Sequence, residues 1–437
     1  MKKVTFKKLA ALTMAIVMSA SVFSGCSQGS SASSAAAASG APAQSTTAKQ
    51  KVNFWYLWGG DEAKVIEKVI AAYNKSQDKY EVVGLSTPDQ QKVLTSISGG
   101  QGPDITDDFG GSIPNYATQS IAMPLDDLIA ADKFDTSVYV DAAFNQQKYQ
   151  GKTYGLPISV NVFALYYNKD LLSKAGITTL PKTLEELMDM SKKTTKVSGG
   201  KVTQMGDPFV TDSYWYYCYT YANGDNFGTA ADKLTPNNAG FKKALEYAAA
   251  EVKAFGKAPL NNYITSGNSK KYTPQDPFCA GTQAFRIDGS WLYKTAKTAN
   301  VNFDIMPLPG TAAKGGDGYS MMDTSMVYIP STTKNKEGAF DFAKYISSGE
   351  GAKIFITEKG DLPSTKALVK DPSIINLQPL YKVYLDIIAK NNLVTLPQMT
   401  DGTEYDKNIR TAVQNVLLGG NVDSELAQLE KSSANLK

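Results

Sequence analysis

The sequence contains no histidine. This absence excludes Ser-His-Asp and Cys-His catalytic arrangements and zinc sites that depend on histidine ligands. The three cysteines offer no thiolate cluster, and we find neither a phosphate-binding loop nor an EF-hand spacing. Among common extracellular enzymes, only glycosidases that use two carboxylates need no residue type that this composition lacks. Because 42 Asp and Glu residues make some carboxylate pair inevitable, that possibility carries little weight.

Arginine is scarce as well, since Arg286 and Arg410 are the only two. A receptor for amino acids or peptides needs a cationic clamp on the ligand carboxylate, and Arg286 lies inside a predicted strand. A metal site would need a cluster of hard or nitrogen ligands that the sequence does not present, so we expect no metal and no cofactor. What the composition offers instead is aromatic rings, with 24 Tyr, 17 Phe and 4 Trp.

A long apolar run occurs only at the start of the chain. Four lysines between positions 2 and 8 precede residues 9–23, which are mostly apolar or small. This run of about fifteen residues is too short to span a bilayer core of ~30 Å, so residues 1–25 are predicted to be a cleaved secretion signal. The string "VFSGC" resembles the lipobox of bacterial lipoproteins, which implies cleavage before Cys26 and a diacylglycerol on its thiol. The alternative is an ordinary secretory signal with an accidental nearby cysteine.

The segment after the signal lacks residues that could form a core. Residues 27–50 contain no aromatic side chain and no Leu, Ile or Val, which predicts a flexible tether. Residues 26–50 are thus interpreted as a lipidated cysteine and a tether that hold the folded body outside the cell membrane. Removal of residues 1–25 lowers the formal net charge from +3 to −1, because they hold four Lys and no acid. A near-neutral body lacks the basic face that nucleic acid binding requires.

The remaining residues, 51–437, are long enough for two domains of ordinary size. Residues 52–57 form a strand-like run, and Asp61 after Gly59 and Gly60 is a candidate helix cap. A second strand (80–85), a helix (90–98) and a third strand (104–106) follow. Strands that alternate with helices predict a mostly parallel sheet with helices on both faces. Ligands of such sheets lie at the carboxyl ends of strands, close to where Trp58 and Asp108 are found.

Five strings occur in an order typical of one family. They are "GQGPDITDDFGGSIPNYATQS", "YQGKTYGLPISVNVFALYYNKDLLSKAGI", "FCAGTQAFRIDGSWL", "FDIMPLPG" and "KEGAFDFAKYISSGEGAKIFITEKGDLPSTKA". The chain resembles sugar-type extracellular solute-binding lipoproteins of the maltose-binding-protein-like family, the receptor subunits of ABC importers. The resemblance runs over residues 51–436. It implies an α/β fold of the type II periplasmic-binding-protein class, with two lobes, a ligand cleft between them and a hinge that the chain crosses several times.

The resemblance also implies that each lobe is discontinuous in sequence. We expect residues 51–158 and 304–345 in lobe 1, and residues 159–303 and 346–437 in lobe 2. The first crossing is expected near residues 158–161, the second near 304–309 and the third after Ser331. The two cysteines of the folded part, Cys218 and Cys279, could pair outside the cell, and the sequence leaves their state open.

Candidate ligand contacts follow from the family positions. Trp58, in the loop after the first strand, is expected to lay its indole on a sugar face, or else to be a tryptophan at the rim of the core. Asp108 matches a carboxylate that accepts hydrogen bonds from sugar hydroxyls, with Asp107 as its rival. Asn161 falls at a cleft-facing position where some relatives carry Glu, and a carboxamide can both donate and accept hydrogen bonds.

The other lobe is expected to contribute further aromatic contacts. Trp291 in "DGSW" matches the family's stacking tryptophan near a helix start, where Gly289 and Ser290 would form a turn and cap. In "TDSYWYYCYTYANG", Tyr214 approximately matches an aromatic contact and Trp215 is a second candidate, whereas the other tyrosines are expected in the core. The family often has a Gly-Gly-Trp-like loop before the strand that ends at Ile329. This chain reads "SMMDTSMVYI" there, and Asp323 is the candidate contact in that segment.

These observations predict a monomeric, non-catalytic binder that captures a mono- or oligosaccharide outside a bacterial cell and delivers it to the transmembrane subunits of an ABC permease. Two competing classes stay open. One is a secreted glycosidase that uses Asp107 or Asp108 with a second carboxylate. The other is a receptor for a non-sugar ligand such as a polyamine or a phosphodiester. The sequence does not determine which sugar binds, its length or its linkage.

Overall fold

The computed structural model describes residues 48–206, 214–316, 318–378 and 380–437. The predicted signal peptide, Cys26 and all of the predicted tether up to residue 47 lie outside the described residues. Residues from Lys49 to Lys437 form one compact unit. In the described part of the chain, no helix combines the length and the apolar character needed to cross a membrane.

The larger sheet of this unit has seven strands. Its order is β13 (Leu362–Pro363), β6 (Gly155–Val162), β12 (Ser320–Tyr328), β3 (Ile105–Phe109), β1 (Gln50–Tyr56) and β2 (Tyr80–Ser86), and β14 (Leu393–Val394) pairs with β12. Strands β1, β2 and β3 are parallel, whereas β12 runs antiparallel to both β3 and β6. The expectation of a mostly parallel sheet is therefore wrong for the whole sheet. The expectation holds for the first three strands. Strand β12 is antiparallel to β3 because the chain reaches it from β11, on the side of the smaller sheet.

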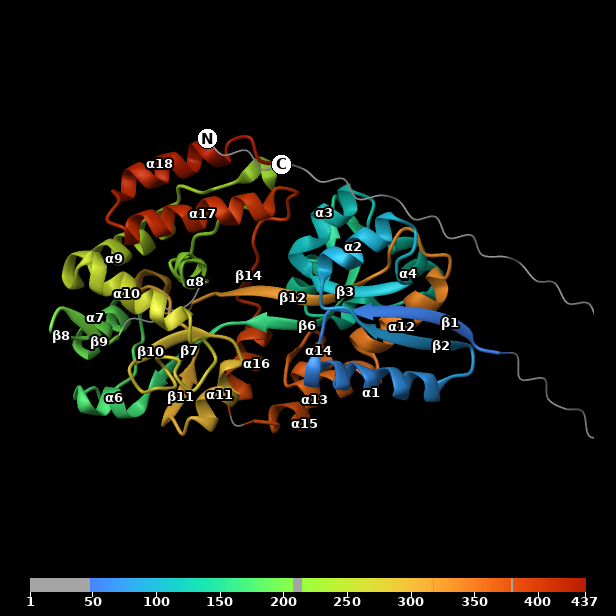
Figure 1. Cartoon of the computed structure of the whole chain (residues 1–437), viewed down its shortest axis with the longest axis horizontal. Coiled ribbons are helices and arrows are strands. Elements are labelled where there is room, and N and C mark those ends of the chain that lie inside the picture. The colour runs from blue at the N-terminus through green and yellow to red at the C-terminus, as the bar shows by residue number, and fades with distance from the viewer. Residues whose placement is uncertain (1–47, 207–213, 317, 379) are drawn as a thin grey trace, which may run out of the picture. The chain divides into compact units, whose positions relative to one another are not determined.

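A smaller sheet has three antiparallel strands in the order β10 (Phe285–Asp288), β7 (Ala164–Asn168) and β11 (Phe303–Met306). Strand β7 follows β6 after a single residue, Phe163. Figure 1 shows the paired strands β6 and β12 between the rest of the larger sheet and the strands of the smaller sheet. In the described residues, the other strands form two short hairpins, β4 (Lys148–Tyr149) with β5 (Lys152–Thr153) and β8 (Lys196–Ser198) with β9 (Lys201–Gln204).

Helices surround both sheets. The helices whose sequence lies next to strands of the larger sheet are α1 (Gly60–Ser76), α2 (Gln90–Ser98), α3 (Ile113–Thr118), α4 (Asp126–Asp132), α5 (Asp141–Asn145), α12 (Lys336–Ser348) and α13 (Glu350–Lys359). The helices that follow α13 are α14 (Lys366–Val369), α15 (Pro372–Ile375) and α16 (Tyr381–Lys390). The remaining helices are α6 (Lys169–Lys174), α7 (Leu184–Thr194), α8 (Trp215–Ala222), α9 (Ala239–Phe255), α10 (Lys257–Asn268), α11 (Leu292–Thr298), α17 (Gly402–Leu417) and α18 (Val422–Ser433).

Local sequence signals explain the first elements. Helix α1 turns one apolar face to the core, since Val65, Ile66, Val69, Ile70 and Tyr73 recur at helical spacing and are all buried. The predicted cap at Asp61 is wrong. Helix α1 begins two residues earlier than that cap implies, with Gly59 at the N-cap, so Asp61 lies in the first turn and pairs with Lys64 at 2.8 Å. An acid in the first turn still stabilises the helix through its dipole.

Of the three hydrophobic clusters in the described residues, two are large. One contains Val52 and Phe54 of β1, Ile66 and Val69 of α1 and Phe355 of α13. The other contains the tyrosines of α8 together with Phe241 of α9 and Ile409 of α17. The two faces of β7 belong to different clusters, because Ala164 and Tyr166 point into the first and Leu165 and Tyr167 into the second. This alternation is the period of two expected for a strand that is buried on both faces.

The packing of three stretches shows how the chain divides between the two sheets. Strand β11 pairs with β7, so residues 303–306 belong to the smaller sheet. Helix α13 packs against α1 and α12, and its Phe355 lies in the core with Val52. Only Gly349 separates α12 from α13, so α13 has to stay beside α12 on the larger sheet. Among the last helices, α17 and α18 pack on α9 in the second cluster.

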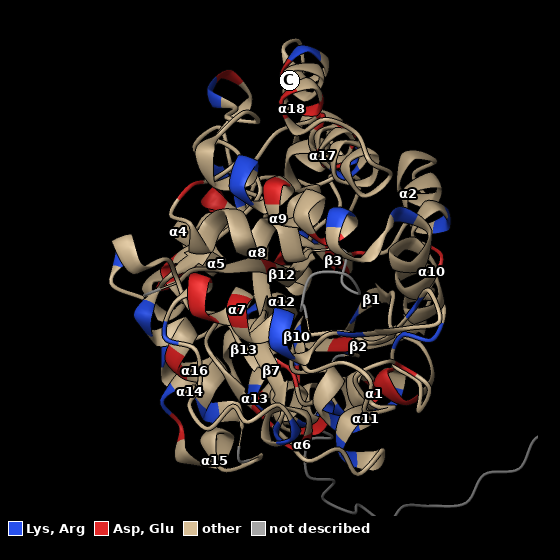
Figure 2. Ribbon diagram, turned by 90° about the vertical axis from the view of Figure 1, so that its left-hand side faces the viewer, with Lys and Arg blue, Asp and Glu red and all other residues tan. Residues whose placement is uncertain are grey.

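The chain passes between the two sheets at three places in the described residues. The chain leaves the larger sheet at residues 162–164 and returns to it between β11 and β12. A third passage lies between α16 and α17, through β14. Basic and acidic residues are both scattered over the helices and loops that Figure 2 presents, which is consistent with the small formal net charge of +3.

Candidate functional site

A cavity of about 770 Å³ lies where the ends of β1, β3, β6 and β12 meet the loop before α11. Six of the seven residues expected to contact a ligand line it, and these are Trp58, Asp108, Asn161, Tyr214, Trp291 and Asp323. They come from six separate segments of the chain. The fold therefore brings together residues that the sequence places far apart, and a single cavity contains both aromatic rings and polar groups.

Trp58 follows the end of β1 and belongs to the rim of a hydrophobic core as well as to the cavity. Its ring packs against Phe355, with the ring centroids 5.3 Å apart. The ammonium of Lys359 lies 6.0 Å from the centre of the Trp58 ring. These contacts fix the indole from the side of α13, a helix that the sequence assigned to the other lobe.

Two neighbouring carboxylates, Asp107 and Asp108, lie near the end of β3, and both line the cavity. Asp107 accepts a hydrogen bond from the backbone N–H of Leu57 at 2.8 Å. Asp108 accepts hydrogen bonds from the hydroxyl of Tyr116 and from the backbone N–H of Phe109 at 2.7 Å. Burial raises the pKa of both carboxyl groups above the ordinary range. The structure thus places the candidate and its rival at the same site.

A polar pair comes from the two long strands in the middle of the unit. Asn161 of β6 lies opposite Asp323 of β12 in the antiparallel register. Asp323 accepts hydrogen bonds from the side chain of Gln146 at 2.8 Å and from the backbone N–H of Thr324 at 2.9 Å. Burial raises the pKa of Asp323 to about 6. Asp323 lines the cavity although the segment lacks the Gly-Gly-Trp loop of the family.

Tyr214 stands at the N-cap of α8 and lines the cavity. Its ring lies 5.6 Å from that of Phe163, and the guanidinium of Arg410 lies 5.2 Å from its centre. Trp215, the next residue, does not line the cavity. Its side chain is only 4% exposed and packs against Tyr216 and Tyr219. Because successive residues of a helix point about 100° apart, one of the two rings had to turn toward the core.

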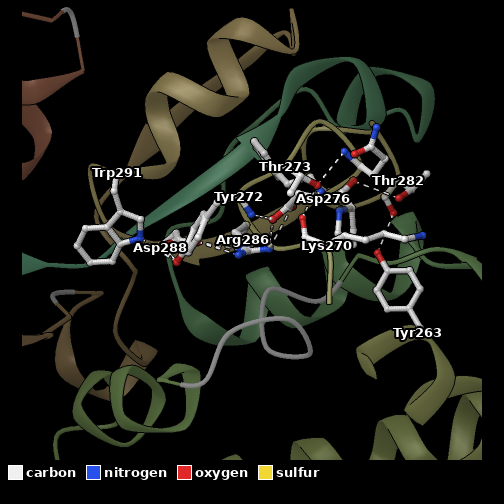
Figure 3. A network of polar contacts seen from close by, with 12 residues as sticks. Tyr263, Lys270, Tyr272, Thr273, Asp276, Thr282, Arg286, Asp288 and Trp291 are labelled. Carbon is white, nitrogen blue, oxygen red and sulfur yellow. Dashed lines mark hydrogen bonds and ion pairs between the residues drawn. The ribbon is translucent and has the colours of Figure 1, made fainter. Parts of the chain in front are cut away.

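Trp291 is the most exposed of the candidate aromatic residues, at 40%. The expected turn at Gly289 and Ser290 does precede it, but Trp291 is itself the N-cap of α11. A Cβ atom at position 289 would overlap the six-membered ring of Trp291, so only glycine permits this ring position. Phe163 meets the indole edge to face, with centroids 5.6 Å apart. Figure 3 shows the ring at the end of a polar network that reaches Arg286.

Several lining residues were not expected from the sequence. Phe109 is 52% exposed and lines this cavity together with a neighbouring one of about 470 Å³. Tyr214 and Asp323 also border both cavities, and Arg410 and Asp406 line only the second. Phe109 directly follows the two predicted carboxylates, so its position in the string "DDFGG" was a usable signal. Phe163 and Arg410 have no comparable local signal, because only the folded chain brings them beside Tyr214.

The charged groups of the cavity are mostly acidic. Lys359 pairs with Asp361 at 2.8 Å and with Glu62 at 3.2 Å, and all three residues line the cavity. Asp107, Asp108 and Asp323 add three carboxyl groups. In the described ranges, no cluster of three His, Cys, Asp or Glu residues has an arrangement suited to a metal ion. The arrangement therefore offers hydrogen-bond acceptors between aromatic rings.

Comparison with known proteins places the chain among transport receptors. Residues 68–379 match the family described as bacterial extracellular solute-binding protein. The galactooligosaccharide-binding protein of Bacillus subtilis (strain 168) is 28% identical over 409 residues, which cover 91% of this chain and 93% of that protein. The maltotriose-binding protein of Pyrococcus abyssi is 24% identical over 343 residues, covering 76% and 70% of the two chains.

Solved structures agree in fold. The structure of CpMnBP1 with mannotriose bound has a TM-score of 0.75 at 25% identity, over 88% of this chain and 100% of that one. The sugar-binding protein MalE from the phytopathogen Xanthomonas citri also reaches a TM-score of 0.75, at 22% identity and over 88% and 98% of the chains. The expected two-lobed α/β fold of the type II periplasmic-binding-protein class is thus confirmed. The chain belongs to the bacterial extracellular solute-binding protein family.

Proposed function

We propose that this protein is the substrate-binding subunit of an ABC importer and that its ligand is a carbohydrate, captured outside the cell and passed on without chemical change. The observation that carries the proposal is the meeting of Trp58, Tyr214 and Trp291 with Asp108, Asn161 and Asp323 around one cavity. Aromatic rings present large apolar faces to the C–H groups of a sugar. Carboxylates and amides between them accept hydrogen bonds from its hydroxyl groups.

The size and charge of the cavity support the same ligand class. Its volume of about 770 Å³ lies within the usual range of ~300–1,000 Å³ for small-molecule sites. Five acidic residues and two lysines line it, and Lys359 is already paired with Asp361 and Glu62. An anionic ligand such as a phosphodiester would meet like charges there, whereas a neutral sugar would not. Relatives named for galactooligosaccharides and maltotriose, and the mannotriose-bound structure, favour an oligosaccharide.

The lobes would be divided by sheet membership. We assign the larger sheet with α1–α5, α12 and α13 to one lobe and the smaller sheet with α6–α11, α17 and α18 to the other. Trp58, Asp107 and Asp108 then come from the first lobe, and Tyr214 and Trp291 from the second. A ligand held by both sets would favour a closed state, because only contacts that differ between two states shift their populations.

The location follows from the predicted lipobox. Processing at Cys26 would anchor the mature chain at the outer face of the cell membrane, with residues 27–50 as tether and permease subunits as partners. Labelling of expressing cells with radioactive palmitate tests this step. We expect the wild-type chain to be labelled and Cys26→Ala to be secreted without label. Equal release of both chains would contradict lipid anchoring.

The ligand class is tested by thermal shift with product analysis. The chain without residues 1–26 is heated with mannotriose, maltotriose and a galactooligosaccharide, because a ligand that binds only the folded state raises Tm. We expect a shift with at least one sugar, recovery of that sugar intact, and loss of the shift in Trp58→Ala. Cleaved sugar would show a glycosidase. No shift with sugars but a shift with a polyamine such as spermidine would overturn the carbohydrate proposal.

A further inference from the structure

The exposed indole of Trp291 does not have its N–H directed to solvent. Its Nε1–H donates a hydrogen bond to the hydroxyl oxygen of Tyr272 at 2.8 Å. Tyr272 lies in the loop between α10 and β10 and lines neither of the two cavities described above. The hydroxyl of Tyr272 in turn donates to a carboxylate oxygen of Asp288 at 3.2 Å. Tyr272 thus links the candidate stacking ring to the interior of the protein (Figure 3).

The interior end of this link is a fully buried ion-pair network. Arg286 lies 2.9 Å from Asp288 and 3.3 Å from Asp276, and all three side chains have no exposed surface. Asp276 also accepts the backbone N–H of Tyr272 at 3.0 Å. A buried ion pair with satisfied hydrogen bonds has little freedom, because breaking it leaves a charge uncompensated. Tyr272 is therefore fixed at its backbone and at its hydroxyl by the same cluster.

The backbone of Tyr272 also carries strain. Its φ is +60°, in the left-handed region that a bulky side chain rarely adopts. Strained residues persist where surrounding contacts determine their conformation, and they gather at functional sites. The hydrogen bonds to Asp276 and Asp288 are contacts of this kind. In this loop conformation, the hydroxyl of Tyr272 lies where it accepts the hydrogen bond from the indole N–H of Trp291.

We propose that Tyr272 is a positioning residue for ligand binding: it holds the Trp291 ring in one rotamer, so that the ring presents its apolar face to the cavity while its N–H is already bonded within the protein. This inference rests on the proposed carbohydrate function. A ring fixed before binding loses less rotational freedom on binding, which improves affinity without any contact between Tyr272 and the ligand. Two further residues restrict the position of the ring. Gly289 has no Cβ atom that would overlap it, and Phe163 packs against it edge to face.

The substitution Tyr272→Phe removes only the hydroxyl group. It keeps the ring, the contact with Lys271 and the same steric demand at positive φ. Tyr319→Phe is a matched control, because Tyr319 is 38% exposed, Tyr272 is 40% exposed and Tyr319 lines neither cavity. Both variants are prepared in the chain without residues 1–26, as is Trp291→Phe, which lacks an indole N–H.

The first measurement needs no ligand. In protein labelled with ¹⁵N-tryptophan, the indole N–H groups of the 4 Trp residues give separate signals, and Trp291→Phe identifies that of Trp291. We expect Tyr272→Phe to shift this signal upfield and to speed its exchange with water, since the hydrogen bond is lost. Tyr319→Phe should leave it unchanged. An unmoved signal in Tyr272→Phe would overturn the proposed positioning.

The second measurement is a double-mutant cycle on sugar affinity, with mannotriose, maltotriose and a galactooligosaccharide as probes. Tyr272→Phe should weaken binding of the sugar that binds wild type about fivefold, as expected for one neutral hydrogen bond. In the Trp291→Phe background the same substitution should change affinity less than about twofold, because its partner is gone.

The outcomes separate the two proposals. An equal loss of affinity in both backgrounds, or none in either, would show that Tyr272 does not act through Trp291. If wild type binds none of the probes, the carbohydrate function fails for those sugars, and the indole signal still decides whether Tyr272 positions Trp291.

Discussion

Asn161 on β6 lies directly opposite Asp323 on β12, and both residues line the same cavity. The pair joins the strand that leaves the larger sheet to the strand that returns to it. Asp323 is held by the side chain of Gln146 and by the backbone N–H of Thr324. Asp323 therefore belongs both to the polar part of the site and to the strands that connect the two sheets. We expect a change in its protonation to change the free energy of unfolding.

The first prediction concerns this carboxyl group. Burial raises the pKa of Asp323 from an ordinary value of 3.8 to about 6, so the folded state binds its proton more tightly than the unfolded state does. The stabilisation from protonation is complete below about pH 4 and is lost as the pH rises through 6. Asp323→Asn should therefore gain stability relative to wild type by roughly 1–3 kcal/mol between pH 4 and pH 7. Urea unfolding of both proteins across this range measures it, and parallel pH profiles would contradict it.

The second prediction separates two tryptophans that were both named as candidate ligand contacts. Trp291→Ala should leave Tm nearly unchanged, because the ring is 40% exposed, and should weaken sugar binding by about 1–2 kcal/mol. Trp215→Ala should instead destabilise the fold by about 3–5 kcal/mol, because it empties a buried site beside Tyr216 and Tyr219. Thermal unfolding and calorimetric titration with the bound sugar distinguish the two. A large loss of Tm in Trp291→Ala alone would reverse the assignment.

The third prediction uses the two arginines of the chain. Arg286→Met leaves Asp276 and Asp288 buried without their cation and should cost about 3–5 kcal/mol of unfolding free energy. Arg410→Met is the control. Its partner Asp406 lies 2.6 Å away, but the two side chains are partly exposed, so the loss should be about 1 kcal/mol. Denaturation in urea compares them, and equal losses would contradict a special role of the buried network.

The fourth prediction concerns the cysteines that the sequence left open. Cys218 lies in the cluster around α8, whereas Cys279 lies in the cluster that contains Val52 and Phe54. Burial raises the pKa of Cys279 to about 12, which keeps its thiol protonated and unreactive. A thiol reagent at pH 8 should therefore detect neither group in the folded chain without residues 1–26. In urea without a reducing agent it should detect two thiols per chain, and zero would indicate a disulfide.

Local patterns in the sequence were sufficient for the first elements and for the family. Alternating strand and helix signals gave β1, β2 and α2 with boundaries within about two residues, and the start of α1 equally closely, because apolar period and turn residues act over short distances. The motif order was enough to name the family and the two-lobed fold. It also pointed to Trp58, Asp108, Asn161, Tyr214, Trp291 and Asp323, which line one cavity in the structure.

Tertiary structure decided what depends on contacts between distant segments. Only packing placed α13 beside α1 and set β12 antiparallel to β3, since neither is encoded in a local period. Only the helical turn at α8 buried Trp215 and left Tyr214 in the cavity. The bond from Trp291 to Tyr272 likewise needs a strained loop held by the buried Arg286 network. By itself, the sequence determined the family of the protein and most of its candidate ligand contacts. The tertiary structure decided which aromatic rings face the cavity and which neighbouring residues hold them in place.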